Sequence, residues 1–503
     1  MPLNLDAPDF GLVVPQLLVF GLAMLLLFGD AFLPSDRHYT WLTGLSLGGY
    51  AVAMASLWWQ DGRNEATFRG LFRADGLTIF LSVVILVAAL LSVMVSASYV
   101  ERLEGRMPLG EFYVLLAFSV LGALLVASAG DLVMIFIGIE LSSLATYVLT
   151  AFAKRRLTSI EGALKYFLLG IFASAILVYG MAWIYGSAGS TNLDVIARNL
   201  QAAIGGEDVR DASLLLGLLL LLVGLGFKMA AVPFHFWTPD AYDGAPTPVT
   251  AFMSVVPKAA AFAATIRILV QGLGPLHDDW INLIAILALL TMAFGNVVAI
   301  SQRNVKRMLA YSSIAHTGYM LVGLAAYQAT GADPDQGVPS LLYYILAYTF
   351  MNIGAFAIVT WLQHRGRGMT LDDFSGLATS HPLAAAAMTV FMVSLMGVPP
   401  LIGFYAKYYV ILAAIEADLL WLALAVVVLS AVSAFFYLRV VAVMYFNDPE
   451  QEPRQARTPL LDAGILGMVL ATIFLGIFST PVIDLADRWV SALSVGTRIA
   501  GGP

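Results

Sequence analysis

Four of the six lysines in this sequence lie inside long apolar stretches, where a charged side chain is costly. They are Lys165, Lys228, Lys258 and Lys407, and Glu140 lies in another such stretch. Each lysine at the centre of a bilayer costs roughly 2.5 to 3.5 kcal/mol on insertion scales. Ionisable groups kept at this cost usually mark an ion or proton path, and lysine suits protons because desolvation lowers its pKa toward neutrality.

The carboxylate of Glu140 is the natural counter-ion for Lys228. A neighbouring carboxylate raises the pKa of a lysine and desolvation lowers it, so a conformational change that separates such a pair would release a proton. The alternative interpretation is a permanent ion pair with a purely structural role. We expect the main proton-transfer residues to be Glu140, Lys228, Lys258 and Lys407.

Three further residues are secondary candidates for the proton path. Lys165 either extends the path toward the buried carboxylate or snorkels from a helix start. His316 and His235 can relay protons because imidazole titrates near neutrality, although lone histidines are more often satisfied core residues. Arg267 and Arg439 are interpreted as fixed counter-charges, since guanidinium does not release protons in proteins.

The composition requires a membrane protein that crosses the bilayer many times. The chain has 503 residues, of which 60% are hydrophobic and 12% charged, far from the soluble globular range. Apolar segments of about 20 residues, matched to a hydrocarbon core of about 30 Å, predict an all-α fold of about 14 transmembrane helices. These helices are expected near 10–33, 39–59, 75–100, 109–128, 131–152, 160–186, 213–238, 247–270, 279–300, 306–328, 339–364, 382–415, 418–446 and 458–480.

Two of the predicted helices contain proline interruptions next to a buried lysine. The helix near 213–238 carries Lys228 and then Pro233, and the helix near 382–415 carries Pro399 and Pro400 before Lys407. Proline inside a helix removes a backbone hydrogen bond and clashes with the preceding turn, so both helices should be broken. Kinks that only fit the packing of a large bundle are the alternative.

The two interruptions are five helices apart, which suggests a duplication. Units with an odd number of crossings must run in opposite directions, so residues 109–270 and 279–446 are predicted to form two inverted five-helix repeats. Residues 1–108 would hold three preceding helices, and 447–503 the last helix and a tail. Paired, interrupted segments point to the transport site of such folds, and Lys258 lies in sequence where it can bridge two half-channels.

The distribution of basic residues predicts the orientation of the chain. The N-terminus lacks the basic region and the cleavage site of a secretory signal. Alternate loops on one side are rich in arginine and lysine, so the positive-inside rule places both termini on the non-cytoplasmic side. The basic residues of the inner side are Arg37, Arg102, Arg106, Lys154, Arg155, Arg156, Arg303, Lys306, Arg307, Arg365, Arg367, Arg454 and Arg457, against Arg63, Arg69, Arg73, Arg198, Arg210, Arg488 and Arg498 outside.

Redox centres and nucleotide sites are not expected in this chain. Cysteine is absent, which excludes disulfides, thiolate-bound zinc and the usual ligands of an iron–sulfur cluster. The six histidines include no pair spaced i, i+4, and there is neither a phosphate-binding P-loop pattern nor a dinucleotide-binding glycine pattern after a strand.

Three long motifs carry a resemblance to a known family. Residues 224–260 read GLGFKMAAVPFHFWTPDAYDGAPTPVTAFMSVVPKAA, residues 302–321 read QRNVKRMLAYSSIAHTGYML, and residues 397–410 read GVPPLIGFYAKYYV, followed by SAFFYLRVVAVMYF at 433–446. The chain resembles, over essentially its whole length, the antiporter-like subunits of respiratory complex I, and the form GAPTPVTAF…PKAA is similar to the subunit N branch.

The resemblance implies roles for individual residues. By motif match the family's helix-five glutamate falls on Glu140, its broken-helix lysine on Lys228, its bridging lysine on Lys258 and its second-repeat lysine on Lys407. The family's helix-six lysine and helix-ten histidine fall on Lys165 and His316. Asp243 stands where glutamate is more usual, a conservative change.

The resemblance also implies a setting. The chain would be a proton-translocating subunit of NADH:quinone oxidoreductase in a bacterial-type inner membrane. FMN, iron–sulfur clusters and quinone would then belong to partner subunits, and the neighbours would be other antiporter-like and small membrane subunits, with no nucleic acid. Two alternatives share the fold: a subunit of a multi-subunit cation/proton antiporter, and a structural subunit that conducts nothing.

Overall fold

The structure is a computed structural model that describes residues 7–32, 38–101, 110–204, 212–328, 336–449 and 456–499, and nearly all of these are helical. The helices are α1 (Val14–Phe32), α2 (His38–Ser56), α3 (Gly76–Glu101), α4 (Gly110–Ala127), α5 (Leu132–Thr150), α6 (Leu157–Ala188), α7 (Leu193–Ile204), α8 (Ala212–Met229), α9 (Trp237–Gly244), α10 (Thr247–Met253), α11 (Val256–Ile266), α12 (His277–Ser301), α13 (Val305–Ala325), α14 (Gly337–His364), α15 (Leu377–Ser380), α16 (Pro382–Met396), α17 (Ile402–Glu416), α18 (Leu420–Phe446), α19 (Pro459–Ile477) and α20 (Thr480–Ile499). A short hairpin pairs β1 (Glu65–Thr67) antiparallel with β2 (Phe72–Ala74). The predicted boundary at 108 and Arg37, Arg102, Arg106, Arg210 and Arg454 lie outside the described residues.

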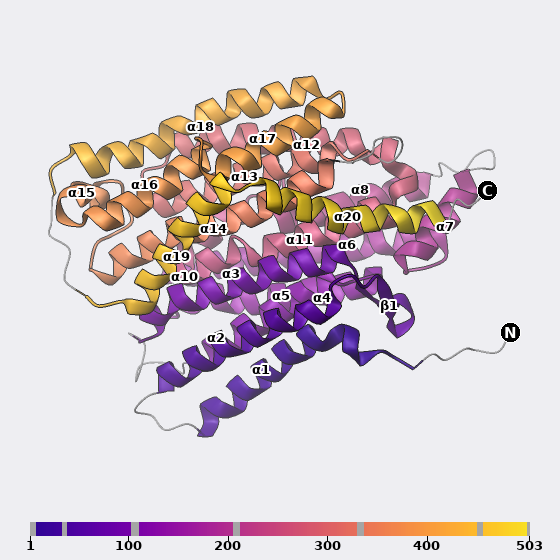
Figure 1. Cartoon of the computed structure of the whole chain (residues 1–503), viewed down its shortest axis with the longest axis horizontal. Coiled ribbons are helices and arrows are strands. Elements are labelled where there is room, and N and C mark those ends of the chain that lie inside the picture. The colour runs from indigo at the N-terminus through magenta and orange to yellow at the C-terminus, as the bar shows by residue number, and fades with distance from the viewer. Residues whose placement is uncertain are drawn as a thin grey trace.

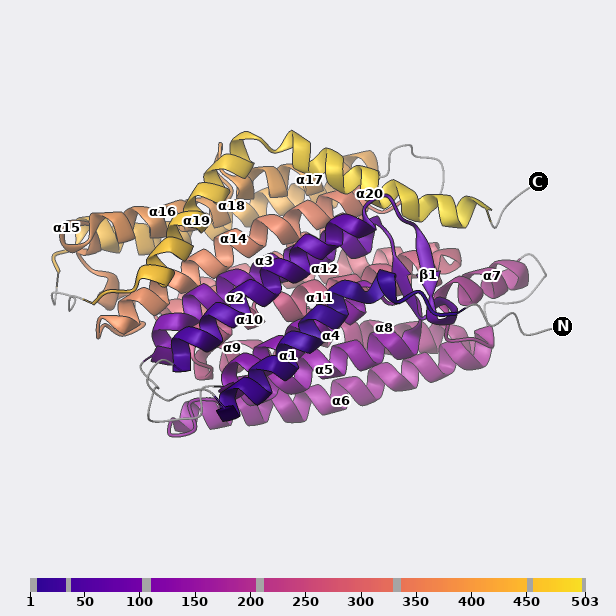
Figure 2. The same cartoon turned by 60° about the horizontal axis from the view of Figure 1, so that its bottom comes forward.

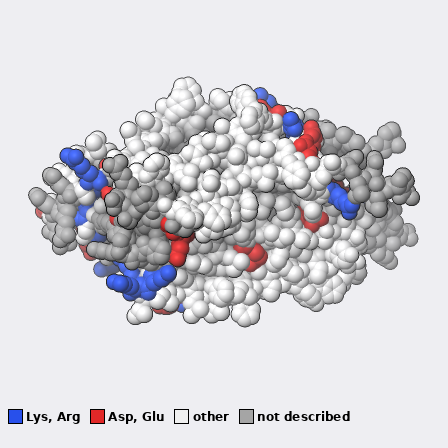
Figure 3. Space-filling model, turned by 90° about the horizontal axis from the view of Figure 1, so that it is seen from below, with Lys and Arg blue, Asp and Glu red and all other residues white. Residues whose placement is uncertain are grey.

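The long helices lie side by side in an elongated bundle (Figures 1 and 2). Within the described parts of the chain, eleven helical runs are long and apolar enough to cross a membrane. On the face seen in Figure 3, lysine and arginine lie mainly toward the two ends of the bundle, and the largely uncharged surface between them carries a few acidic patches. The protein is therefore a multi-pass membrane protein.

The eleven apolar runs are fewer than the 14 helices predicted from sequence. The difference falls on α2, α13 and the pair α16 and α17. Helix α2 is diluted by threonine, serine and glycine, α13 carries two basic residues, a histidine and several hydroxyl side chains, and the break between α16 and α17 leaves two short pieces.

Both proline interruptions break their helices, as predicted. Helix α8 ends at Met229 and α9 begins at Trp237; α16 ends at Met396 and α17 begins at Ile402. The second break contains Gly397 with φ of +92°, a conformation that glycine adopts without the steric cost of a side chain. The predicted helix over 213–238 is thus shorter than expected.

A third interruption was not predicted. The segment 247–270 is divided at Ser254 and Val255 into α10 and α11. Pro257 lies in the first turn of α11, where its missing N–H costs no intrahelical hydrogen bond. The helix predicted near 247–270 is present as one apolar run, Thr247–Gly272, and only the interruption inside it was not predicted, because a proline at a helix start leaves the apolar pattern unchanged.

Polar side chains cover the backbone groups that the first break exposes. The Thr317 hydroxyl donates to the Met229 carbonyl at 2.9 Å, and Trp237 Nε1 donates to the Phe227 carbonyl at 3.0 Å. The Val232 N–H donates to Thr291 Oγ1 at 3.0 Å. A broken helix survives in a bilayer only where protein or water satisfies such groups.

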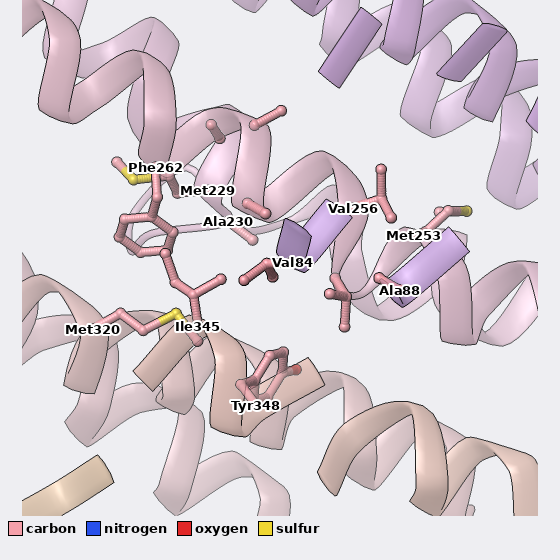
Figure 4. Packing of buried hydrophobic residues seen from close by; sticks show 14 of the residues in the cluster. Val84, Ala88, Met229, Ala230, Met253, Val256, Phe262, Met320, Ile345 and Tyr348 are labelled. Carbon is pink, nitrogen blue, oxygen red and sulfur yellow. The ribbon is translucent and has the colours of Figure 1, made fainter. Parts of the chain in front are cut away.

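Apolar residues from α3, α11, α13 and α14 fill the space around the first break (Figure 4). The side chains labelled there are Val84, Ala88, Met229, Ala230, Met253, Val256, Phe262, Met320, Ile345 and Tyr348. All ten are buried, so protein covers this side of the break, whereas Pro233 and Phe236 on its other side are exposed.

The same local structure occurs twice along the chain. Asp131 begins α5 and forms an antiparallel bridge with Asn192, beyond the end of α6; Asn304 begins α13 and forms one with Thr370, beyond the end of α14. Two backbone hydrogen bonds of 2.8 to 3.0 Å flank each bridge. In both places the first residue caps its helix through a side-chain oxygen, so the start of α5 corresponds to the start of α13.

A buried ion pair ties α3 to the end of α11. Asp75, just before α3, receives hydrogen bonds from Arg267 at 2.5 and 2.7 Å, and the two side chains are 2% and 0% exposed. Arg267 also donates to Thr78 Oγ1 at 2.8 Å and to the Ala127 carbonyl at 3.0 Å. Arg267 is thus fixed by a bidentate carboxylate, in line with its interpretation as a counter-charge.

We expect Asp75→Ala to lower the free energy of unfolding by about 3 to 5 kcal/mol, because it leaves the buried Arg267 charge without its carboxylate. Asp194→Ala is the matched control: Asp194 pairs with Arg73 but its side chain is 48% exposed, so its loss should cost less than about 1 kcal/mol. Denaturant unfolding in mixed micelles measures both. Equal losses in the two variants would contradict the prediction.

Candidate functional site

Glu140 and Lys228 form the predicted ion pair. Lys228 Nζ lies 3.1 Å from Glu140 Oε1 and donates to Ser143 Oγ at 3.0 Å, and Ser174 Oγ donates to Glu140 Oε1 at 2.5 Å. Lys228 occupies the last turn of α8 directly before the break, and its side chain is 7% exposed. The pair therefore links α5, α6 and α8 beside an interruption of the backbone.

The carboxylate of this pair can be reached from the side of the bundle. A cavity of about 570 Å³ between α5 and α6 is lined by Glu140, Ser174 and apolar side chains that include Phe136, Ile171 and Tyr179. Glu140 is 21% exposed and Lys228 lies behind it. The carboxylate thus stands between a surface opening and the buried amine.

Lys258 connects α11 to α13 without a carboxylate among its hydrogen-bond acceptors. Its ammonium donates to the Ser313 carbonyl at 2.7 Å, to Ser313 Oγ at 2.6 Å and to Thr317 Oγ1 at 3.0 Å, and the residue is 3% exposed. Since Thr317 also donates to the Met229 carbonyl, this hydroxyl joins Lys258 to the residue that follows Lys228.

His316 lies on α13 between Ser313 and Thr317, the two residues that accept hydrogen bonds from Lys258. One ring nitrogen is 2.8 Å from the Tyr344 hydroxyl and the other 3.1 Å from the Tyr437 hydroxyl, and the residue is 1% exposed. Both nitrogens therefore have hydroxyl partners that can donate or accept, an arrangement compatible with either tautomer. Histidine and tyrosines together form a buried polar cluster on α13, α14 and α18.

Lys407 lies at the second break. Its ammonium donates to the Met396 carbonyl at the end of α16, at 2.8 Å, and lies 4.8 Å from the ring centre of Tyr319. The His316 and Tyr319 rings, both on α13, are 5.7 Å apart. The buried polar groups therefore run from Lys258 along α13 to Lys407.

The other predicted histidine stands apart from this row. His235 lies in the first break, is 3% exposed, and packs its ring against Phe294 at 4.4 Å and Phe236 at 4.7 Å. Within the described part of the chain its Nδ1 has no hydrogen-bond partner. The structure brings no lysine into contact with it among those residues.

Lys165 belongs to an ion network at the surface. It is 44% exposed and pairs with Glu161 at 2.7 Å and with Asp240 of α9 at 2.9 Å, and Arg307 of α13 lies 3.0 Å from the same Asp240. These pairs hold α9, the piece after the break, between α6 and α13. Over the described residues, no hydrogen bond or ion pair joins Lys165 to Glu140.

We expect Lys165→Arg to retain proton transfer within about twofold of the unchanged protein. Arginine keeps the fixed charge that positions Asp240, and an exposed ion pair contributes only about 0 to 1 kcal/mol. Proton uptake by membrane vesicles, normalised to the assembled complex, provides the measurement. A loss of pumping as large as that of Lys228→Arg would instead make Lys165 a proton carrier.

The hydroxyl partners of the site were not predicted from sequence. Ser143, Ser174, Ser313, Thr317 and Tyr437 contact the charged groups or His316. Serine and threonine in membrane helices are also frequent where helices pack closely. Only the spacing of Ser143 from Glu140 and of Ser313 from His316, three residues each, places them on the same helix face.

Comparisons with known proteins agree with this geometry. Residues 129–433 match the family model described as NADH:quinone oxidoreductase/Mrp antiporter, TM. The NADH-quinone oxidoreductase subunit N of Chloroflexus aggregans is 43% identical over 97% of this chain and 98% of its own. A chain of respiratory complex I from Thermus thermophilus with bound Aureothin is 33% identical, with a TM-score of 0.77 over 93% of this chain and 98% of that one.

A chain of the Mrp complex from Dietzia sp. superimposes with a TM-score of 0.80 over 98% of both chains, at 22% identity. That likeness shows a common fold only. The identity and coverage of the subunit N relative, together with the family model, decide the assignment: this chain belongs to the NADH-quinone oxidoreductase subunit N family.

Proposed function

We propose that this chain translocates protons as a membrane subunit of an NADH:quinone oxidoreductase. The observation that carries the proposal is the Glu140–Lys228 pair, in which a half-buried carboxylate meets a buried amine beside a broken helix, together with two further buried lysines. Such ionisable groups are costly in a membrane and are kept where they move charge. The family to which the chain belongs provides the electron-transfer partner that such pumping requires.

The order of the groups suggests how a proton moves. Lys228 keeps its proton while it is paired with Glu140; if the pair separates, the desolvated amine favours release. Lys258 is the next amine, joined to the first break through Thr317. From there His316 and the tyrosines lead to Lys407.

Energy for this transfer must come from elsewhere in the complex. Moving one charge against 100 mV requires about 2.3 kcal/mol, and the chain contains no cysteine to bind a cluster. In the described ranges no group of three histidine, aspartate or glutamate side chains gathers to hold a metal. From the family to which the chain belongs, we assign FMN, iron–sulfur clusters and quinone to partner subunits. Other antiporter-like subunits and small membrane subunits are the expected neighbours of this chain.

We propose 14 transmembrane helices in two inverted repeats, 109–270 and 279–446, preceded by 1–108 and followed by 447–503. Adding α2, α13 and the α16–α17 pair to the eleven apolar runs supports the number. The matching bridges at the starts of α5 and α13 support the repeat. Five crossings per repeat make the copies antiparallel, and the positive-inside rule places both termini outside the cytoplasm of a bacterial inner membrane.

The first test is to isolate the tagged full chain in mild detergent, identify what copurifies, and assay inhibitor-sensitive oxidation of NADH by quinone. A large active assembly that pumps protons after reconstitution supports the proposal. A small assembly that exchanges cations for protons without NADH would make the chain an antiporter subunit. Full pumping in Lys228 and Lys407 variants would leave it a structural subunit.

A further inference from the structure

A second cavity, far in sequence from the proton path, lies where three helix ends meet. It has a volume of about 490 Å³ and is lined by Arg365, His381, Ala456 and Arg457. Helix α14 ends just before Arg365, and α16 begins just after His381. Helix α19 begins at Pro459, two residues after Arg457. Two guanidinium groups and an imidazole therefore line one opening.

The Arg365 guanidinium is held in a fixed position. It lies 3.5 Å from the centre of the Trp361 ring, a cation–π contact, and Nη2 donates to the Ala456 carbonyl at 2.6 Å. The residue is only 7% exposed. A charged group fixed in this way at a cavity wall recognises planar or tetrahedral oxyanions with little loss of side-chain entropy.

The electrostatic environment favours an anion. Burial, and then the guanidinium groups of Arg365 and Arg367, lower the pKa of His381, which reports a positive potential at the opening. Helices α16 and α19, of 15 and 19 residues, both begin here, and helix N-termini carry partial positive charge and free N–H groups. The carboxylate of Asp462 accepts hydrogen bonds from Trp361 Nε1 at 2.9 Å and from Thr458 Oγ1 at 3.1 Å.

Apolar side chains stand next to this polar opening. Leu383, in the first turn of α16, is 87% exposed, and Leu460, in the first turn of α19, is 37% exposed. A basic cavity with apolar neighbours at the end of membrane helices has the character of a headgroup site with room for acyl chains alongside.

We propose that this cavity binds a phosphate group, supplied either by an anionic phospholipid headgroup or by free phosphate, through Arg365 and Arg457. The site is separate from the Glu140–Lys228 path and does not rest on the proposed pumping function. Its expected role is to bind the ends of α14, α16 and α19 together at the polar boundary of the bundle.

The test uses the full chain in detergent with phosphatidylglycerol as the probe and native mass spectrometry as the readout. We expect Arg457→Gln, which removes an exposed side chain, to raise the apparent Kd about tenfold, the loss expected for one charge-assisted contact. Arg365→Gln should raise it at least as much. The matched control is Arg198→Gln, an exposed arginine on α7, with a change below about twofold.

Inorganic phosphate distinguishes the two sources. Displacement of phosphatidylglycerol by millimolar phosphate, with weaker displacement in Arg457→Gln, assigns the site to free phosphate; retention of the lipid assigns it to the headgroup. If Arg365→Gln unfolds at a lower temperature than the unchanged protein, its loss of binding has a second explanation, and Arg457→Gln alone tests the site. The proposal would be overturned if Arg457→Gln left the affinities for lipid and phosphate unchanged. It would also be overturned if Arg198→Gln lowered these affinities as much as Arg457→Gln does.

Discussion

Lys228→Arg is expected to leave the complex assembled and to lower NADH-driven proton pumping at least about tenfold. Arginine keeps a positive charge opposite Glu140 and can reach Ser143, so a purely structural ion pair would be preserved. It does not release a proton in proteins, so a relay through this position would stop. Loss of an acid–base group commonly costs two to four orders of magnitude in rate.

The measurement is the rate of proton uptake in vesicles per assembled complex, with NADH oxidation followed in parallel. Lys154→Arg is the matched control, because Lys154 is 63% exposed and lies 3.9 Å from its nearest carboxylate, that of Glu111. Unchanged pumping in Lys228→Arg at normal assembly would show that the pair is structural.

The positions of the breaks and of the first ion pair could be predicted from sequence. Proline within an apolar helix has one main consequence, the loss of a backbone hydrogen bond, and both predicted breaks are present. A carboxylate is the strongest partner for a buried lysine, and Glu140 is the acidic residue that the described structure places beside Lys228. These inferences succeeded because each depends on a large local energy that few arrangements can satisfy.

Other features depend on three-dimensional packing that the pattern does not encode. Helices α7 and α20 are amphipathic and too polar to resemble membrane spans, so no helix was predicted in 187–212 or after 480. The pairing of Asp75 with Arg267 joins residues 192 positions apart. Lys165 lies in an apolar segment, as the buried lysines do, yet its side chain reaches the surface.

The inverted repeat remains a prediction. So does the assignment to the proton path of all seven candidate residues, which are Glu140, Lys228, Lys258, Lys407, Lys165, His235 and His316. The corresponding bridges at the starts of α5 and α13 support equivalence of the two units. By that correspondence Glu140 matches Ser313, nine residues beyond the bridge in each copy. If the two units are equivalent, the first places a carboxylate where the second places a hydroxyl that binds Lys258.

Lys407→Arg is expected to lower pumping at least about tenfold as well, for a reason specific to the second break. Lys407 Nζ donates to the Met396 carbonyl, and a Cβ added at Gly397 would lie 2.9 Å from Lys407 Cδ, so a side chain at position 397 would crowd the lysine. Among the described residues no carboxylate pairs with it, so its charge is held by a carbonyl and an aromatic ring. Arginine can keep those contacts but cannot complete a proton transfer.

The double variant Lys228→Arg/Lys407→Arg tests whether the two breaks serve one path. If both lysines lie in series on one path, either single replacement already stops transfer. The pumping rate of the double variant should then be no lower than the lower of the two single-variant rates. If the halves conduct independently, each single variant retains part of the flux and the two losses combine. Vesicle pumping rates for the four proteins, compared at equal assembly, give the coupling directly, and combined losses would rule out a continuous relay through Lys258.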